Sequence, residues 1–509
     1  MKLKIMIMAL LMVSVGIGSA VNYLPASTMA GDLDFGLEHY ITSLANESKL
    51  VWTVGFTPDC DVVLEDSPTV CHAGAINAIL NAASAKNKAS DVPSVVMLKN
   101  GRYNVINESI VVRHFTTLMG MNRPGGGAWL PSPYTTPDIK YRYTVINVTY
   151  EGDSAIRMNG ASTLSNLAIV YPNQKGYNAS WDWIQYPAAI YLIPHTADGG
   201  IDSDGNNEGV KVSNIFMPNP WIGLDLTDKH TFAIFEDIYM APFFKGVYIG
   251  SSGIGSTEPT IYRNIRVNSL LYGYDTLDYA KTNLWKFVRG NLTAFDINRD
   301  DGARFSDCYV YWANQGFIFR NTMGVRLINC GTDNMGLYGL RLNGVKRATV
   351  TGGLWHGNVR GITIDGTSSG NIITGLNILS GGRGIYIESS GLDTTFYEPA
   401  WGNIVSGCNI RFNTNNAGYT YGIEVAAGKQ TSITGNVING LNKSMSGGIA
   451  VVGSATDTMI SGNIITGCPN YGVTTSGTNG VYSGNLFTSS GPVDYTGAGT
   501  WGGSGNVSV

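Results

Sequence analysis

A short hydrophobic pattern recurs through the second half of the chain. Its unit is a glycine, an apolar residue, any residue and a second apolar residue, followed by a variable position. Clear copies begin at Gly316, Gly339, Gly361, Gly384 and Gly422. Alternation of apolar and variable positions with a period of two is typical of half-buried β-strands. The pattern therefore predicts a short strand at each copy.

A second series of short strands runs in phase with the first. Its later copies contain Ser/Thr-Gly-Asn, as in 434–436, 461–463 and 483–485. A single unit of this kind cannot bury its own apolar face, whereas stacked units can. No helical pattern separates the strands, which argues against leucine-rich and α/β repeats. The repeat therefore predicts an all-β solenoid, a single-stranded parallel β-helix.

Aligning the coils places Asn436, Asn463 and Asn485 at equivalent inward positions. Stacked asparagine side chains can hydrogen-bond along the axis, which keeps each buried amide satisfied. Cys408 occupies the same column in an earlier coil, and we expect it to be a buried small apolar residue rather than a redox group.

The start of the repeat region has a different pattern. Residues 73–89 predict an amphipathic helix, and 95–105 and 109–123 predict strands and turns. A helix at this point can cover the apolar end of a solenoid, as a terminal cap must. We therefore expect an N-terminal capping helix on the β-helix.

The first 20 residues have the pattern of a signal peptide. Lys2 and Lys4 precede an uncharged, mostly apolar run that ends in small residues at 18–20. The run is short for a membrane-spanning helix, which needs about 20 residues. We expect a secreted or cell-surface protein with no membrane span after removal of 1–20; the alternative is an uncleaved anchor.

These patterns also divide the chain. We expect an N-terminal segment over 21–73, the β-helix over 74–490, and a C-terminal tail or cap over 491–509.

Composition agrees with short strands joined by tight turns. The chain has 65 glycines in 509 residues, and charged residues make up only 14%, against about 25% in ordinary soluble proteins. The formal net charge of −4 offers no basic surface for nucleic acid, so we expect no nucleic-acid partner.

Export permits disulfide bonds. Cys60 and Cys71 bracket a short loop and are predicted to form one, whereas the other four cysteines lack the spacing of metal ligands. The acidic loop 198–208 is a candidate Ca²⁺ site. It lacks the glutamate of the twelfth EF-hand position, and the alternative is a solvated loop. No other cofactor is indicated.

The opening of the repeat region also resembles a known one. The helix AINAILNAASA, the strand SVVMLKNGRYNV and the segment SIVVRHFTTLMGMNR are similar to the opening of pectate-lyase-like and tailspike-like proteins. With the repeated S/T-G-N-x-I coil, roughly 74–490 resembles the right-handed parallel β-helix superfamily of pectate lyases, polygalacturonases and phage tailspikes. The resemblance implies the right-handed fold. It selects no activity, because the superfamily holds lyases, hydrolases, epimerases, adhesins and structural proteins, and the catalytic motifs of its enzymes are not matched.

Candidate chemistry lies on the outward positions of the coils. Residues two and four places after each repeat glycine should face outward, because side chains alternate along a strand. This puts Asp365 and Glu388 on neighbouring coils, roughly 5 Å apart. Two carboxylates at this separation raise one another's proton affinity, and a glycosidase needs such a pair. We predict that Asp365 and Glu388 are catalytic.

Basic and aromatic residues surround this pair. The arginines could bind acidic sugar groups, or could act in β-elimination with arginine as the base. Aromatic residues of the long coil after Gly384 could stack on sugar rings, and His356 could act as an acid or base. The alternative is a solvent-facing network of ion pairs that contributes little. The residues predicted to bind substrate are Arg341, Arg360, Arg383, Tyr386, Trp355, His356, Tyr397 and Trp401.

Three functions fit these patterns. The first is an exported protein that binds and cleaves an extracellular polysaccharide, by hydrolysis or β-elimination. The second is a non-enzymatic surface or filament protein, and the third is a spike-like receptor-binding trimer; both imply a homo-oligomer. The first requires convergent carboxylates and arginines, whereas the second predicts long, flat apolar patches.

Overall fold

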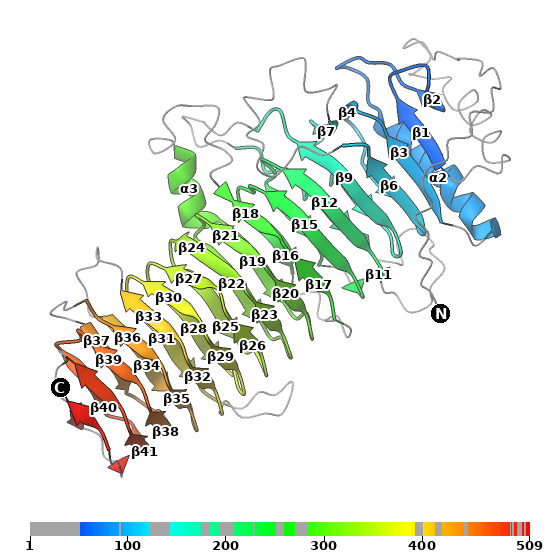
Figure 1. Ribbon diagram of the computed structural model, residues 1–509. Helices are drawn as coiled ribbons and strands as arrows, with labels where there is room; N and C mark the ends of the chain where they lie inside the picture. The colour runs from blue at the N-terminus through cyan, green and yellow to red at the C-terminus, as the bar shows by residue number, and fades with distance from the viewer. Residues whose placement is uncertain are drawn as a thin grey trace, which may run out of the picture.

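Short strands alternate with sharp bends along the chain, and every pairing between described strands is parallel. In the computed structural model the strands stack coil upon coil into a long rod (Figure 1). The structure describes residues 51–90, 93–122, 143–174, 183–193, 207–227, 230–250, 259–269, 283–391, 401–412, 420–441, 446–488, 490, 493–495, 501–502 and 505–508. The predicted signal peptide, Tyr397 and nearly all of the acidic loop 198–208 lie outside these residues.

One side of the rod is a sheet of 14 strands, one from each coil. These are β5 (Ile110–Val112), β8 (Ile156–Met158), β10 (Ile190–Leu192), β13 (Ile222–Asp225), β16 (Lys245–Ile249), β19 (Thr293–Asn298), β22 (Gln315–Arg320), β25 (Tyr338–Asn343), β28 (Arg360–Gly366), β31 (Arg383–Ser389), β34 (Thr420–Ala427), β37 (Ser446–Val451), β40 (Tyr471–Thr475) and β43 (Val493–Tyr495).

The remaining sides form a sheet of 29 strands, which divides into two ladders. The first ladder contains β1 (Val51–Gly55), β3 (Ser94–Leu98), β6 (Thr116–Gly120), β9 (Thr163–Val170), β12 (Lys211–Met217), β15 (Ile234–Met240), β17 (Ile261–Arg263), β20 (Arg304–Ser306), β23 (Arg326–Ile328), β26 (Thr349–Thr351), β29 (Ile372–Thr374), β32 (Ile404–Ser406), β35 (Ser432–Thr434), β38 (Thr456–Ser461), β41 (Thr478–Ser483) and β44 (Trp501–Gly502).

The second ladder shares β9, β12 and β15 with the first. Its other strands are β4 (Gly101–Val105), β7 (Thr144–Val148), β18 (Arg266–Asn268), β21 (Tyr309–Tyr311), β24 (Gly331–Met335), β27 (Leu354–Gly357), β30 (Asn377–Ser380), β33 (Asn409–Phe412), β36 (Val437–Asn439), β39 (Ile464–Thr466), β42 (Leu486–Thr488) and β45 (Val507–Ser508). The short strand β2 (Val62–Val63) pairs with β1 at the start of the first ladder. A separate two-stranded sheet pairs β11 (Asn207–Glu208) with β14 (His230–Thr231).

In most described coils from β9 onward, a residue with positive φ makes the bend between the two ladders; the coil of β26 and β27 has two, Gly352 and Gly353. Early coils use asparagine or aspartate, as at Asn214 (φ 56°) and Asp307 (φ 56°), and later coils use glycine, as at Gly435 (φ 65°). Glycine adopts this conformation without a Cβ penalty, and Asn and Asp tolerate it better than other residues do. A Cβ at Gly435 would meet nothing within 4 Å, so the backbone angle, and not crowding, explains the glycine.

The predicted asparagine ladder forms inside this bend. Asn436 Nδ2 donates to Asn463 Oδ1 at 3.0 Å, and Asn463 Nδ2 donates to Asn485 Oδ1 at 2.9 Å. The ladder continues to Asn506 at 3.1 Å. At its other end the Cys408 backbone N–H donates to Asn436 Oδ1 at 2.9 Å. The side-chain amide of each buried asparagine therefore donates a hydrogen bond to the asparagine of the next coil.

The predicted cap is confirmed as helix α2 (Ala73–Ser90). Its Ile76, Ile79 and Leu80 are buried in the core that runs along the rod, and the helix lies across the first coils in Figure 1. Parallel pairing begins before the predicted boundary at residue 74, because β1 pairs with β3. It also extends past residue 490, because β45 pairs with β42.

Helix α3 (Asn283–Asn291) was not expected, because the repeat region was predicted to lack helices. It stands on the side of the rod between β18 and β19 (Figure 1). Its Leu284 and Val288, one turn apart, are buried in the core, and Phe287 packs beside them. An apolar spacing of three and four residues explains the helix. No helix in the described ranges is long and apolar enough to cross a membrane.

The predicted disulfide is absent from the structure. Cys60 and Cys71 are both free thiols. The Cys60 sulfur lies near the Thr57 hydroxyl, at 3.6 Å, whereas the Cys71 sulfur accepts a hydrogen bond from the Ile106 N–H at 3.4 Å. The other four cysteines are buried, as expected for small apolar residues.

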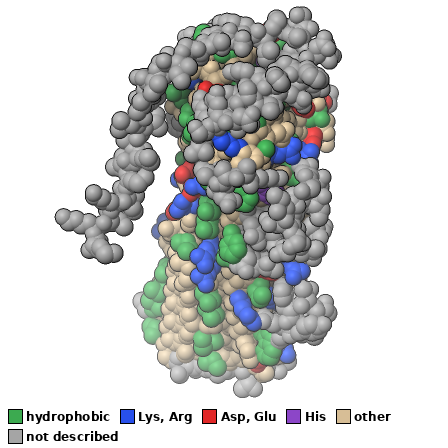
Figure 2. Space-filling model, turned by 90° about the vertical axis from the view of Figure 1, so that its right-hand side faces the viewer, with side chains coloured by type: hydrophobic (Ala, Val, Ile, Leu, Met, Phe, Trp, Pro, Cys, Tyr) green, Lys and Arg blue, Asp and Glu red, His purple; other side chains and the backbone are tan. Residues whose placement is uncertain are grey.

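Exposed apolar side chains form columns on the C-terminal half of the rod, where stacking places like positions above one another. Val437 and Ile464 are register partners on adjacent coils, and both are about 40% exposed (39% and 41%). Met459 and Val481 form a second such pair. The lower part of Figure 2 shows hydrophobic side chains lined up in this manner.

Replacing Asn463 with alanine should destabilise the fold by about 3 kcal/mol, because buried hydrogen-bonding groups of two neighbouring coils lose their partners. The free energy of unfolding in urea measures this. The control is Asn377→Ala in the exposed Asn377–Asn409 pair, which should change stability by less than about 0.5 kcal/mol. Equal losses in the two variants would contradict the assigned role of the ladder.

Candidate functional site

The outer face of the 14-stranded sheet carries the carboxylates and arginines predicted to act on substrate, together with Tyr386. Asp365 and Glu388 are register partners on β28 and β31, and so are Arg360 and Arg383. The predicted juxtaposition of the two carboxylates is therefore confirmed at the level of strand register. Their catalytic role stays a prediction.

The two carboxylates have different surroundings. Asp365 Oδ2 accepts from Arg341 Nη2 at 2.7 Å and Nε at 2.9 Å, while Oδ1 accepts from Asn343 Nδ2 at 2.9 Å. The Asp365 side chain is only 14% exposed. Glu388 is exposed and accepts a hydrogen bond from the Tyr386 hydroxyl. Asp365 is thus a fixed, ion-paired carboxylate, whereas Glu388 is open to a ligand.

Tyr386 lies between two arginines. The guanidinium carbon of Arg360 lies 3.9 Å from the ring centroid of Tyr386, and that of Arg383 lies 5.1 Å away. Arg360 also lies 5.9 Å from the ring of Tyr338. Burial raises the pKa of the Tyr386 phenol, and the hydrogen bond to Glu388 raises it further, so this hydroxyl remains a donor at neutral pH.

Most cations on this face are neutralised by a carboxylate of a neighbouring coil. Arg383 Nε donates to buried Glu424, as Arg341 does to Asp365. Arg360 differs, because it makes no ion pair in the part of the chain that the structure describes. Its Nε is buried and has no hydrogen-bond partner among those residues. Arg360 is therefore a positioned cation without a counter-charge among the described residues of this face.

Sequence reasoning singled out neither Tyr338 nor Glu424. Tyr338 occupies the position of Arg360 one coil earlier, and the register pairs the two. Glu424 occupies the position of Tyr386 one coil later. Aligning the repeats in the sequence already places Tyr338 beside Arg360 and Glu424 beside Tyr386. The pairing of Arg383 with Glu424 across a 41-residue separation became evident only in the structure.

Two predicted substrate-binding residues lie elsewhere. The prediction for Trp355 is wrong, because its side chain is fully buried in the core and packs edge-on against Phe317, with ring centroids 5.4 Å apart. Its Nε1 donates to the Gly352 carbonyl at 3.2 Å. The strand β27 turns this position inward because residues alternate faces.

His356, the next residue, points away from the core on the second ladder and not on the 14-stranded sheet, but it is buried, with only 7% exposed. Its Nδ1 lies 2.9 Å from Asp333 Oδ1 and 3.0 Å from the Asn334 nitrogen. Its Nε2 is buried and has no hydrogen-bond partner in the described ranges. His356 therefore belongs to a different face from the carboxylate pair.

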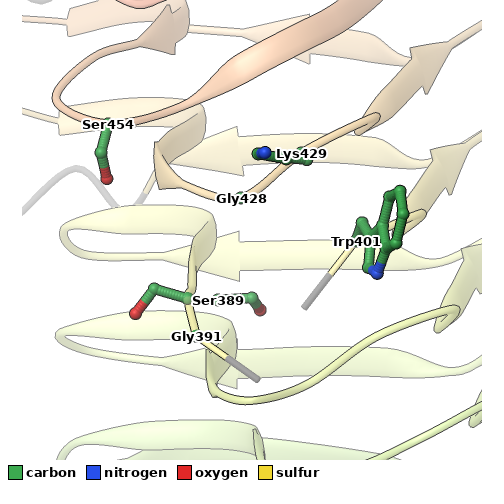
Figure 3. A pocket seen from close by; sticks show the side chains of 7 residues that line it. Ser389, Gly391, Trp401, Gly428, Lys429 and Ser454 are labelled. Carbon is green, nitrogen blue, oxygen red and sulfur yellow. The ribbon is translucent and has the colours of Figure 1, made fainter. Parts of the chain in front are cut away.

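A pocket of about 320 Å³ lies just beyond Glu388, where β31 and β34 end. Its described lining is Ser389, Ser390, Gly391, Trp401, Gly428, Lys429 and Ser454. Trp401 was predicted to bind substrate, and it is 40% exposed here. Figure 3 shows Trp401 and Lys429 along one side of the pocket and Ser454 on the other. Lys429 was not anticipated, because it lies in a turn without a distinctive motif.

A metal site finds no support among the described residues, which contain no group of three or more His, Cys, Asp or Glu side chains that could hold an ion. The candidate Ca²⁺ loop falls almost wholly outside them. A calcium requirement therefore stays a prediction.

Core and surface tryptophans should respond differently to truncation. Trp355→Ala should cost about 3–5 kcal/mol in unfolding free energy, because it leaves a cavity in the core. Trp401→Ala should change stability by less than about 0.5 kcal/mol, because the side chain is half exposed. Urea unfolding of the two variants checks this, and a stable Trp355→Ala protein would contradict the core assignment.

Comparisons with known proteins agree with the geometry of the coils. Residues 293–465 match a family model described as "Right handed beta helix region". No curated protein matches the sequence significantly.

Several solved structures are similar to this chain at low identity. The A-module of a mannuronan C-5 epimerase from Azotobacter vinelandii shares 14% identity at a TM-score of 0.44, over 87% of this chain and 97% of its own. DFA-IIIase from Arthrobacter chlorophenolicus shares 12% at 0.46, over 80% and 94%. Tailspike protein 3 of bacteriophage CBA120 shares 12% at 0.40, over 86% and 59%.

The family match covers the central coils, and the same parallel register continues on both sides of them, from β1 to β45. The chain therefore folds as a right-handed parallel β-helix.

Proposed function

We propose that this protein is exported and binds an acidic extracellular polysaccharide on the outer face of its 14-stranded sheet, around β28 and β31. The observation that carries the proposal is Arg360, a half-buried cation without a carboxylate partner in the described chain, held against two tyrosine rings. Export rests on the signal-peptide pattern of residues 1–20.

The surroundings of Arg360 favour a carboxylated sugar over other ligands. A guanidinium group binds carboxylates through paired, charge-assisted hydrogen bonds. The faces of Tyr338 and Tyr386 offer apolar surface for a sugar ring, and tyrosine hydroxyls offer polar contacts. Arg341 and Arg383 are already paired with Asp365 and Glu424. A negative charge on the ligand is therefore needed only beside Arg360.

The same face can support cleavage. Strands of neighbouring coils are about 4.8 Å apart, and retaining glycosidases hold their two carboxyl groups about 5–5.5 Å apart. Asp365, fixed by Arg341 and Asn343, would serve as the oriented carboxylate, and exposed Glu388 would transfer the proton. Two carboxylates in different environments can take different roles. Hydrolysis and β-elimination both remain open to these groups.

A second function is favoured by a separate observation. The two exposed apolar columns, one with Val437 and Ile464 and the other with Met459 and Val481, are the kind of surface expected of a rod that assembles side by side. In this alternative the β-helix acts as a surface or filament protein or as a spike-like oligomer. The two functions use different faces and are compatible.

Removing the unpaired cation should weaken binding. Arg360→Ala should lower affinity for polygalacturonate by roughly tenfold or more, because a charge-assisted contact is lost, and Arg360→Lys should restore only part of it. Isothermal titration at low and moderate salt measures both. The control, Arg326→Ala, removes an exposed arginine from the other sheet. Equal affinity of Arg360→Ala and wild type on every acidic glycan would overturn the proposed site.

Cleavage should depend on both carboxylates. Asp365→Asn and Glu388→Gln should each lower product formation from an acidic polysaccharide by about a hundredfold or more, with binding largely kept. Reducing ends report hydrolysis, and ultraviolet absorbance of unsaturated products reports β-elimination. Wild-type turnover that persists in the double variant would remove this pair from catalysis while leaving the binding site in place.

A further inference from the structure

The pocket beyond Glu388 contains the groups that a charged sugar requires. Trp401 and Lys429 come from adjacent coils and are joined by a parallel backbone bridge. Trp401 is 40% exposed, and Lys429 is exposed and makes no ion pair with a residue that the structure describes. An exposed indole offers a flat face for a sugar ring, and an ammonium group offers a charge for a carboxylate.

The backbone around the pocket also allows close approach. Gly391 and Gly428 both adopt positive φ, 87° and 129°. The nearest atom to a Cβ at Gly391 would be about 4.0 Å away, and at Gly428 3.5 Å away. At these two turns, therefore, no atom of the described chain fills the space directly beside the main chain. Ser390 and Ser454 line the same space with hydroxyl groups, which suit a ligand rich in hydroxyls.

Strand register fixes where this pocket lies relative to the proposed site. Arg360 and Arg383 begin β28 and β31, and the strands run from them toward Asp365 and Glu388. Ser389 directly follows Glu388 and forms part of the pocket wall. The five steps along the strand from Arg383 to Glu388 span roughly 16.5 Å at about 3.3 Å per residue. Glu388 therefore lies between the cation Arg360 and the pocket.

We infer that the pocket is a second subsite for a carboxylated sugar unit of the same polysaccharide, so that the chain crosses the sheet along the strand direction. This inference rests on the proposed function. Arg360 holds one unit near the start of the strands, and Trp401 with Lys429 holds another beyond their ends. Glu388 then faces a linkage between the two, which is the arrangement of an enzyme or binder that acts inside a chain and not at its end.

The two subsites predict a dependence on ligand length. A short oligomer can occupy only one subsite, whereas a longer one occupies both, and its second contact forms at a high effective concentration. In the wild-type protein, affinity for galacturonate oligomers should rise steeply once the oligomer spans the sheet. Neutral glucose oligomers of equal length should show no such rise, because neither cation has a partner.

Titration of galacturonate dimers to octamers against Lys429→Met and Trp401→Ala tests the inference. Both variants should weaken octamer binding by about tenfold and change dimer binding by less than about twofold. Trp401→Phe should retain part of the affinity, because an aromatic face remains. Lys286→Met, which removes an exposed lysine from α3, is the matched control and should behave as wild type.

The outcomes separate the subsite from the proposed function. If Arg360→Ala weakens binding but Lys429→Met and Trp401→Ala leave octamer affinity unchanged, the subsite is wrong and the function stands. If Lys429→Met weakens binding but Arg360→Ala does not, the spanning arrangement is wrong and so is the site at Arg360. Equal affinity for galacturonate and glucose octamers would overturn the acidic specificity of both.

Discussion

Parallel stacking of coils is the interaction on which the rest of this structure depends. Each coil has too little apolar surface to bury itself, so its core exists only against the coils above and below. The asparagine ladder shows how strictly the register is held, because Asn463 Oδ1 accepts from both the backbone N–H and the side-chain amide of Asn436, and Asn485 Oδ1 accepts from the same two groups of Asn463. A shift of one residue would expose the core residues and bury the outward ones.

The same stacking governs the chemistry of the surface. A residue placed outward on one coil lies about 4.8 Å from its counterpart on the next, so charged side chains of neighbouring coils can pair. Arg341 pairs with Asp365 and Arg383 with Glu424 between neighbouring coils, each diagonally and not with its own register partner. Arg360 faces Arg383 in register, and Tyr386 lies between the two guanidinium groups. One aromatic ring thus contacts both like charges, and Arg360 has no anion beside it among the described residues.

Alternation along a strand explains both the successes and the failure among the predicted site residues. It correctly placed Asp365 and Glu388 together and outward. Trp355 was assigned to the substrate cleft from its nearness in sequence, but its strand directs it into the core. His356 faces out, yet on a different ladder, because a turn separates β27 from β28. Nearness in sequence does not predict a shared face when the chain bends between strands.

Local patterns in the sequence determined the coil, the inward asparagines, the capping helix and the adjacent carboxylates, because each depends on a short period repeated many times. Tertiary structure alone decided which charges are neutralised, since Arg383 finds Glu424 across 41 residues. It also decided that Trp401 and Lys429 share a pocket with the end of β31. Because the coils differ in length, the number of residues between stacked positions varies along the chain. Contacts across the long coil therefore follow from packing and not from the repeat.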